Sequence, residues 1–373
     1  MYEIWHTILW SQYKAKVFNE LYRISEENSS DIRFFQIAET SGERALLSKV
    51  DFNLHKYPYT LLFNGSIDNV NKVTLIAKMA KYALTSEAKF TILSGYHTAE
   101  YWTQLIILIL RRKPRGVFCD STVNDHPQIW WKTILKRIFF SYCNKIFCYG
   151  QRSKEYIMLH GVPEEKIVIR CQAAALPHNY DKETAIFRRQ KERSESPKFI
   201  YVGRMAAEKN LHILLNAFNA FSQTTPSATL RMIGNGVLRD QLTNYCVANH
   251  IQGVTWVGSL SGEELWSEYL AASAMILPST SEPWGLVVNE ALSFGCPVIV
   301  SDKCGCVPEL VIDGKTGYAI NPFDASDITD KMHKSVELLQ TDETSDICIH
   351  LMQGYSPHHA AQQIYDGLAE QCR

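Results

Sequence analysis

The stretch that decides the fold is residues 280–301, TSEPWGLVVNEALSFGCPVIVS. An apolar segment with helical spacing lies between a loop that carries Glu282 and a short run rich in Val and Ile. Glu290 stands inside the helical segment, among apolar residues. Carboxylates are seldom placed in such surroundings unless they are paired or functional. Glu282 and Glu290 are therefore the first candidate functional residues.

Strand-like and helix-like segments alternate on both sides of this stretch. From Lys198 onward the expected strands are KFIYVG, ATLRMIG, GVTWVGS, AMILPS and PVIVS, and the expected helices are NLHILLNAFNAF, LRDQLTNYCVAN, GEELWSEYLAA and GLVVNEALSFG. The first half repeats the rhythm with the strands YEIWHTIL, IRFFQIA, YTLLFNG, KFTILSG, GVFCDS, KIFCYG and KIVIRC. Such alternation predicts parallel sheets that helices cover on both faces, as in Rossmann-like domains.

The segment 172–197 interrupts this rhythm with proline, serine and charged residues, so we place a domain boundary there. A chain of 373 residues is also too long for one ordinary core. The fold class we predict is α/β, with two facing Rossmann-like domains over about 1–175 and 176–356 and a cleft between them. Ligands of such sheets bind at the carboxyl ends of the strands.

Composition is that of an ordinary soluble protein, with 46% hydrophobic and 21% charged residues. The net charge of -1 is unevenly spread: residues 1–190 carry 26 Lys+Arg and 18 Asp+Glu, and the remainder carries 12 and 21. The two halves are therefore expected to face different partners. Ten cysteines without a C-x-x-C pair, and a start without signal-peptide features, predict free thiols in the cytoplasm. The apolar run 105–110, LIILIL, is too short to span a bilayer and is interpreted as a buried helix face.

The start of the helical segment is a candidate phosphate site. Gly285 opens the helix, and the free amides at a helix start, here those of Gly285 and Leu286, bear the positive end of its dipole. Glu290 lies about 7.5 Å further along at roughly 1.5 Å per residue, which matches the distance from a phosphate to a ribose. A carboxylate can accept two hydrogen bonds, as vicinal hydroxyls require.

Two cations are expected at the same sheet edge. Arg204 follows one strand and Lys209 begins the next helix, where both could neutralise a diphosphate. Gly234 and Gly236 follow the next strand, but Arg239 replaces the third glycine of a dinucleotide fingerprint. The pair of glycines then indicates a tight turn that lets a ligand approach the backbone.

The series GRMAAEKN, IGNG, WVGSLSGEEL, EPWGLVVNEALSFGCPVIVSDKCGCVPELVIDGKTG and YSPHHAAQQIYDGL resembles the donor half of the family-4 retaining glycosyltransferases, which have the GT-B fold, over about residues 198–370. The resemblance implies that Arg204 and Lys209 bind the donor diphosphate with help from the amides near Gly285 and Leu286. It also implies that Glu282 contacts the donor sugar and Glu290 the ribose. The base would border WVGSL, which contains Gly258 and Leu260, and a closing helix at 357–373 would return to the first, acceptor-side domain.

The first half resembles the family less closely. The segment ILWSQYKAKVFNEL has no glycine where many relatives have a glycine-rich loop. Where many relatives have a catalytic-site histidine this chain has Asp120, while His126 follows six residues later and His97 follows an earlier strand. All three residues stay candidates for the side chain that faces the sugar.

Cofactor and partner expectations follow from the same residues. No Asp-x-Asp pair or His/Cys cluster is visible, which predicts a metal-independent site for a UDP-, GDP-, TDP- or ADP-sugar. The acceptor would be a glycan or a lipid-linked glycan. RRKPR at 111–115 and WWKTILKRIFFSY at 130–142 are basic and aromatic together, which suits peripheral contact with the inner face of a membrane or, equally, a packed helix with snorkelling lysines. No nucleic-acid motif accompanies the charge.

The leading functional hypothesis is a retaining glycosyltransferase of surface-polysaccharide or glycoconjugate synthesis. A nucleotide-sugar epimerase of similar fold is one alternative, because it would bind the same donor. The other is a non-catalytic protein that binds nucleotide-sugars or glycans.

Overall fold

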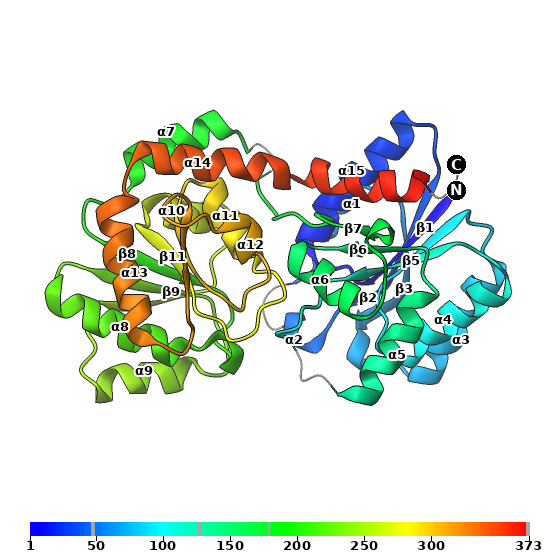
Figure 1. Ribbon diagram of the computed structural model, residues 1–373, viewed down its shortest axis with the longest axis horizontal. Coiled ribbons are helices and arrows are strands. Elements are labelled where there is room, and N and C mark those ends of the chain that lie inside the picture. Colours follow the sequence, from blue (N-terminus) through cyan, green and yellow to red (C-terminus); the bar gives the residue numbers. More distant parts are fainter. Residues whose placement is uncertain (46–48, 126–128, 178–179, 371–373) are drawn as a thin grey trace. The chain divides into compact units, whose positions relative to one another are not determined.

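The chain folds into two compact units, each built on one parallel sheet (Figure 1). The first unit comprises residues 1–175 and 356–373, and the second comprises residues 176–355. The structure, a computed structural model, describes residues 1–45, 49–125, 129–177 and 180–370. The α/β class with two Rossmann-like sheets is confirmed.

In the described residues of the first unit, seven strands lie in the order β3-β2-β1-β4-β5-β6-β7. The strands are β1 (Tyr2–Ile8), β2 (Ile32–Thr40), β3 (Tyr59–Ser66), β4 (Phe90–Leu93), β5 (Arg115–Cys119), β6 (Lys145–Cys148) and β7 (Ile167–Val168). The helices are α1 (Gln12–Glu27), α2 (Gly42–Ala45), α3 (Lys72–Thr85), α4 (Ala99–Leu110), α5 (Trp130–Ser141), α6 (Gln151–Leu159) and α15 (Pro357–Ala369). Every strand pair is parallel, and central strands such as β4 and β6 are buried along their whole length.

The C-terminal helix α15 completes the core of the first unit and lies beside α1 (Figure 1). Ile364 and Leu368 are fully buried there, and the Tyr365 hydroxyl lies 2.9 Å from that of Ser30. Gly367 allows the close approach, because a Cβ at this position would lie 2.8 Å from the Phe147 ring.

The part of the second unit that the structure describes has six strands in the order β10-β9-β8-β11-β12-β13. They are β8 (Lys198–Val202), β9 (Thr229–Ile233), β10 (Val254–Gly258), β11 (Ala274–Leu277), β12 (Val298–Ser301) and β13 (Gly317–Ile320). The helices are α7 (Lys182–Glu192), α8 (Leu211–Thr224), α9 (Arg239–Ala248), α10 (Gly262–Ala271), α11 (Leu286–Ser293), α12 (Val307–Leu310), α13 (Ala325–Leu338) and α14 (Asp342–Met352). The order reverses between β8 and β11, so this pair marks the topological switch point of the sheet.

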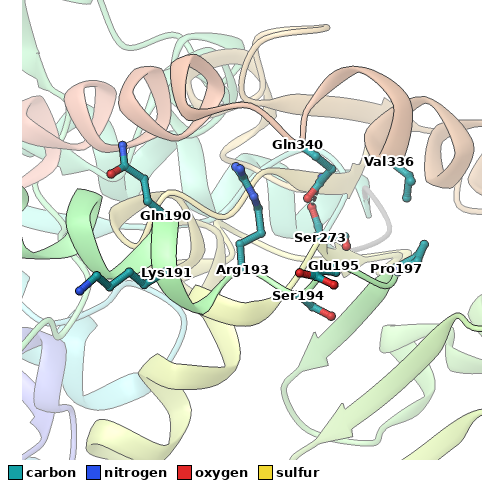
Figure 2. Close-up of a pocket in the computed structure, with 9 residues that line it drawn as sticks. All are labelled: Gln190, Lys191, Arg193, Ser194, Glu195, Pro197, Ser273, Val336 and Gln340. Atoms are coloured by element: carbon teal, nitrogen blue, oxygen red, sulfur yellow. Dashed lines mark hydrogen bonds between the residues drawn. The ribbon is translucent and has the colours of Figure 1, made fainter.

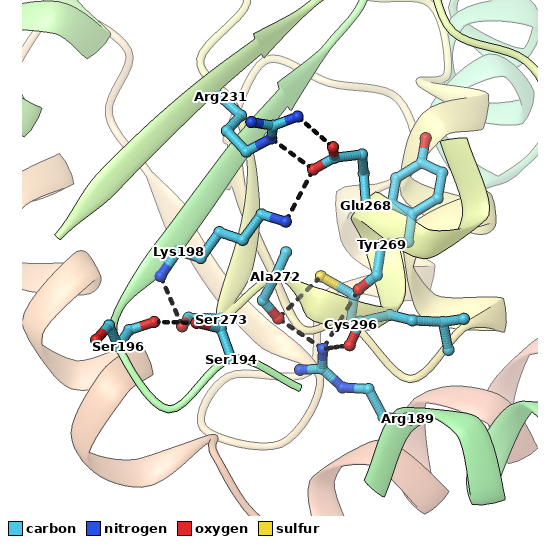
Figure 3. Close-up of polar contacts among 11 residues, drawn as sticks. Arg189, Ser194, Ser196, Lys198, Arg231, Glu268, Tyr269, Ala272, Ser273 and Cys296 are labelled. Carbon is cyan, nitrogen blue, oxygen red and sulfur yellow. Dashed lines mark hydrogen bonds and ion pairs between the residues drawn. The ribbon is translucent and has the colours of Figure 1, made fainter. Parts of the chain in front are cut away.

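The interpretation of 172–197 as a plain break in the pattern is wrong in one respect, because α7 lies within it. Asp181 caps this helix by accepting a hydrogen bond of 2.8 Å from the Thr184 amide. The fully buried Arg189 then fastens α7 to the end of α10, donating to the carbonyl oxygens of Leu270 at 2.6 Å and Ala272 at 2.7 Å (Figure 3).

A second buried polar group lies nearby, at the start of β8 (Figure 3). Glu268 on α10 accepts a hydrogen bond of 2.8 Å from Arg231 and pairs with Lys198 at 3.0 Å. Burial opposes the charge of Glu268, but these two cations outweigh it and lower the pKa of the carboxyl. The group ties β8, β9 and α10 together.

The expectation that LIILIL is a buried helix face is also only half right. Leu105 and Leu108 are buried in α4, but Ile106 is 50% exposed and Leu110 is 77% exposed. Six consecutive apolar residues cover more than one turn of a helix, so some of them must face away from the core. In the described part of the chain, no helix is both long and apolar enough to cross a membrane.

Candidate functional site

The candidate donor residues of the second unit lie at the carboxyl edge of its sheet, on both sides of the switch point. Arg204 and Lys209 follow β8, and Glu282, Gly285 and α11 follow β11. Because β8 and β11 are neighbouring parallel strands, the loops after them emerge side by side. This is the position where open α/β sheets bind their ligands.

Lys209 and Glu282 form an ion pair across the switch point. Their side chains are 12% and 18% exposed, so the pair is partly withdrawn from water without being sealed off. An ammonium has three donors and a carboxylate about four acceptor positions. Each partner therefore keeps hydrogen-bonding capacity beyond the pair itself.

The loop after β8 is held in place by a buried tyrosine. The Tyr201 hydroxyl donates to the carbonyl oxygen of Arg204 at 2.6 Å, and burial raises the pKa of this phenol well above its usual value, so it stays a neutral donor. The Arg204 guanidinium lies 3.0 Å from the carboxylate of Glu208. The Thr280 amide in turn donates to the Glu208 carbonyl at 2.8 Å, which joins the loop after β8 to the loop after β11.

The two glycines after β9 are required by close backbone contact. A Cβ on Gly234 would lie 2.0 Å from the carbonyl oxygen of Gly203, and its φ of +124° is one that other residues rarely adopt. A Cβ on Gly236 would lie 2.4 Å from the Met205 carbonyl oxygen. This turn therefore packs directly against the loop that carries Arg204.

The turns after β9 and β10 are joined to each other. The Gly234 amide donates to the Gly258 carbonyl at 2.7 Å, and the Asn235 side-chain amide donates to the Ser259 hydroxyl at 3.0 Å. Leu260 follows and is partly buried. The residues predicted to border the base thus continue the same edge of the sheet.

Gly285 is the N-cap of α11 and has a φ of +97°, which fits glycine. Leu286 is the first residue of the helix, as the sequence predicted. The Gly305 amide donates to the Glu282 carbonyl at 2.9 Å and so fixes the loop before the helix. In the first turn of α11 the Val288 amide donates to the Gly285 carbonyl at 2.9 Å. The amides at the very start of a helix point out of its end, which is what an anion-binding helix start needs.

Glu290 lies in α11 and accepts a hydrogen bond of 2.9 Å from the Tyr269 hydroxyl on α10. Burial raises the pKa of Glu290 to about 7, and the hydrogen bond from Tyr269 only partly opposes that rise. The side chain is still partly accessible. Near neutral pH this carboxyl is therefore divided between its charged and neutral forms.

Two of the candidates in the first unit follow strands of its sheet. His97 follows β4 and is exposed, with its ring 5.8 Å from that of Tyr101. Asp120 follows β5 and is also exposed, and its carbonyl oxygen accepts a hydrogen bond of 3.1 Å from Ser153. His126 lies outside the described residues. Both described candidates are at the carboxyl edge of the first sheet.

Sequence reasoning missed a buried lysine at this edge. Lys14, in the first turn of α1, is only 3% exposed, and its Nζ lies 4.5 Å from the centre of the Phe118 ring and 5.1 Å from that of Tyr149. Burial lowers its pKa to about 8. Its place among the apolar positions of α1 was the signal that could have found it.

A cavity of about 470 Å³ lies elsewhere in the second unit, lined by residues of 190–197 together with Ser273, Val336 and Gln340 (Figure 2). These residues precede β8 and β11 or lie at the C-terminal end of α13 and just after it, so the cavity belongs to the amino-terminal edge of the sheet. None of the candidate donor residues lines it. Within the described ranges, no group of three or more His, Cys, Asp or Glu side chains could hold a metal ion.

The fold and this sheet edge define an α/β protein of the GT-B type, and known proteins resemble the chain in sequence and in structure. Residues 182–346 match the model for glycosyl transferases group 1. It is 33% identical over 156 residues to the sulfoquinovosyl transferase of Arabidopsis thaliana, covering 41% of this chain and 28% of that protein. It is 34% identical over 141 residues to the glycogen synthase of Mycobacterium tuberculosis, covering 38% and 34%. The aligned part spans between 22% and 53% of the curated relatives.

Solved structures resemble the chain over its whole length. The lipopolysaccharide outer core galactosyltransferase WaaB, in its apo form, has a TM-score of 0.72 at 17% identity, covering 99% of both chains. The HepE protein of Anabaena, in complex with UDP and glucose, has a TM-score of 0.71 at 17% identity, covering 99% of this chain and 100% of that one. At this identity the likeness establishes the fold.

Proposed function

We propose that the protein is a retaining glycosyltransferase that moves a sugar from a nucleotide-sugar to a hydroxyl of a glycan or lipid-linked glycan. The observation that carries the proposal is the Lys209–Glu282 pair at the switch point, with Arg204 in the adjoining loop. Two cations and a carboxylate at this edge suit a donor that is anionic at its diphosphate and hydroxylated at its sugar.

The diphosphate would be held by three groups with different geometry. The Lys209 ammonium has three N–H donors, so it can stay paired with Glu282 and also donate to a phosphate. The Arg204 guanidinium has five N–H donors, more than its ion pair with Glu208 requires. The amides at the start of α11 add the positive end of the helix dipole. As the glycosidic bond breaks, these donors stabilise the charge that develops on the leaving diphosphate.

The remaining donor contacts follow from position. Glu282 would accept hydrogen bonds from the sugar hydroxyls, Glu290 from the ribose, and the turns at Gly234, Gly236 and Gly258–Leu260 would border the nucleotide. HepE is solved with UDP-glucose, so UDP-sugars are the donors to test first. With Arg204 and Lys209 supplying the positive charge, we propose that transfer is metal-independent.

In the proposed reaction the bond from the anomeric carbon to the diphosphate oxygen breaks and its electron pair leaves with the diphosphate. The acceptor oxygen forms the new bond on the same face, and its proton passes to a departing phosphate oxygen. The first unit would bind the acceptor, with Asp120, His97 and His126 as candidates to face the sugar. We place the reaction at the cytoplasmic face of a membrane, in polysaccharide or glycoconjugate synthesis.

Thermal-shift screening against UDP-, GDP-, TDP- and ADP-sugars tests donor binding, because a ligand that binds only the folded state raises the melting temperature. Glu290→Ala should weaken the free energy of donor binding by about 1.5 to 3 kcal/mol. Glu282→Ala should chiefly lower turnover, by raising the activation free energy by about the same amount. Transfer to acceptors, with the anomeric configuration of the product read by NMR, tests the reaction. Wild-type kinetics in both variants would contradict the site.

The alternatives predict different outcomes of the same assays. An epimerase would change the sugar of the donor when no acceptor is present. A binding protein would show a thermal shift with no turnover across a broad acceptor panel.

A further inference from the structure

Helix α5 presents an apolar face to solvent. Six large apolar side chains on it are between 42% and 75% exposed: Trp130 75%, Trp131 47%, Ile134 48%, Leu135 43%, Ile138 42% and Tyr142 at its C-cap 49%. At 3.6 residues per turn these positions gather within about 140° of the helix circumference. They form one continuous face, called here the α5 face.

The α5 face points away from the core of the first unit. The buried side chains of α5 are Phe139 and Phe140. Phe140 projects from the side opposite the α5 face, and Phe139 lies next to the border of the face, beside Leu135. The edge of the Phe139 ring meets Trp102 of α4, with ring centres 5.2 Å apart. The helix is thus anchored near its C-terminal end, while its first two turns carry exposed apolar residues. An ordinary surface helix has the reverse arrangement.

Positive charge flanks the α5 face. Helix α5 itself carries Lys132, Lys136 and Arg137 and has no Asp or Glu. Lys132 lies over the Trp131 ring at 5.4 Å, and Arg137 donates to the Leu159 carbonyl at 3.3 Å. Among the described residues no carboxylate forms an ion pair with Lys132, Lys136 or Arg137. A basic border around an aromatic and aliphatic face is the pattern of helices that lie in a lipid interface.

We propose that the α5 face inserts into the interface of an anionic lipid membrane, parallel to its surface. A helix of 12 residues is about 18 Å long, enough to lie in the interface and too short to cross it. Anionic lipid complements the surrounding cations. A second copy of this chain fits less well, because a symmetric contact through the face would bring the same cations together.

The other basic segment, 111–115, has a different role from the α5 face, because two of its cations make contacts within the first unit. Arg111 donates to the carbonyl oxygens of Ala83 and Ser86 at 3.0 and 2.5 Å and pairs with Glu87 at 3.2 Å. Arg115 donates to the Lys113 carbonyl at 2.6 Å, and burial lowers its pKa. These two cations fasten loops within the first unit, so neutralising the segment would disturb the fold. The α5 face carries the inference instead.

Flotation of the whole protein with vesicles tests the proposal. Vesicles of phosphatidylcholine with about 30% phosphatidylglycerol should capture the protein, and pure phosphatidylcholine should capture at least about tenfold less. Ile134→Glu and Ile138→Glu should each reduce capture by at least about tenfold, because they place a charge on the inserted face. Leu338→Glu is the matched control, since Leu338 is 58% exposed on α13 of the second unit and should leave capture unchanged.

The charge requirement is tested separately. Lys132→Gln should lower capture about fivefold, and raising salt from about 0.1 M to 1 M should lower it for the wild type. Arg112→Gln, an exposed cation in the other basic segment, is the control and should have little effect.

Donor binding by thermal shift is measured in every variant. Because α5 lies in the first unit, the shift should be kept, so that loss of capture is not confused with unfolding or with failure of the donor site. Capture that ignores lipid charge, or that survives both glutamate variants, overturns the proposal. So does a wild-type dimer in sedimentation that Ile138→Glu converts to monomer while the wild type ignores the vesicles.

Discussion

Replacing Glu290 by glutamine isolates the electrostatic cost of placing a carboxylate inside α11. Glutamine keeps the shape and can still accept the hydrogen bond of 2.9 Å from Tyr269. It removes only the ionisation. We expect Glu290→Gln to stabilise the ligand-free protein at pH 8 and to leave its stability nearly unchanged at pH 4.5.

The magnitude follows from the raised pKa. Burial raises the pKa of Glu290 from 4.5 to about 7, so the folded protein holds this proton more tightly than the unfolded chain. Between these two values the folded state binds more protons, and the free energy of unfolding therefore falls as the pH rises. At roughly 1.4 kcal/mol per pH unit the loss is about 3 kcal/mol, complete above pH 7. The glutamine variant lacks this loss.

Urea unfolding of wild type and Glu290→Gln across pH 4.5 to 8 measures the difference, with the midpoint compared at constant slope. The control is Glu264→Gln, on the exposed side of α10, which should change stability by less than about 0.5 kcal/mol at every pH. A difference between wild type and Glu290→Gln that does not grow with pH refutes the argument. Equal stability at pH 8 does so too.

Three further predictions concern the same sheet edge. Lys209→Ala and Glu282→Ala should each destabilise the protein by about 2 kcal/mol, and the double variant by less than the sum, in a double-mutant cycle read by urea unfolding. Glycosyl transfer should persist in EDTA, and a complete loss of activity that manganese restores would contradict metal independence. Arg204→Ala should lower donor affinity at least about tenfold, because it removes a cation that would bind the diphosphate. Gly234→Ala should lower the free energy of unfolding, measured by thermal melting, by more than about 3 kcal/mol, because the added Cβ would lie 2.0 Å from a carbonyl oxygen. For Gly258→Ala the added Cβ would have no atom within 4 Å, and the loss should be about 1 to 2 kcal/mol.

The sheets could be predicted from sequence because parallel strands carry their signal locally. The four residues of β11 and the four of β12 are all buried, and each stands as a short apolar run between helical segments. Helix α7 was missed although Asp181 supplies an N-cap signal three residues before Thr184. Proline and charge nearby outweighed that signal. The partner of Arg189, a row of carbonyl oxygens about 80 residues away, has no trace in the local sequence.

The candidate site was predictable in position but not in pairing. That Lys209 and Glu282 share one edge follows from strand order, since both come after neighbouring strands. That their side chains meet depends on loop geometry, which the Thr280 and Gly305 amides fix through backbone hydrogen bonds. Lys14 was overlooked because a lysine on an apolar helix face usually snorkels to water, and here aromatic rings enclose it instead.

At this edge each cation is paired with a carboxylate of the same unit. Lys209 meets Glu282 and Arg204 meets Glu208, so neither cation stands partly buried without compensation. The backbone hydrogen bonds from the Thr280 and Gly305 amides hold the loops of these pairs in place. If a diphosphate binds here as proposed, it would meet two cations and a helix start that lie at the same edge of the sheet. Groups that are in place before charge develops are the ones that stabilise it most effectively. On the proposed function, the Lys209–Glu282 pair would therefore both stabilise the loops and prepare the edge for an anion.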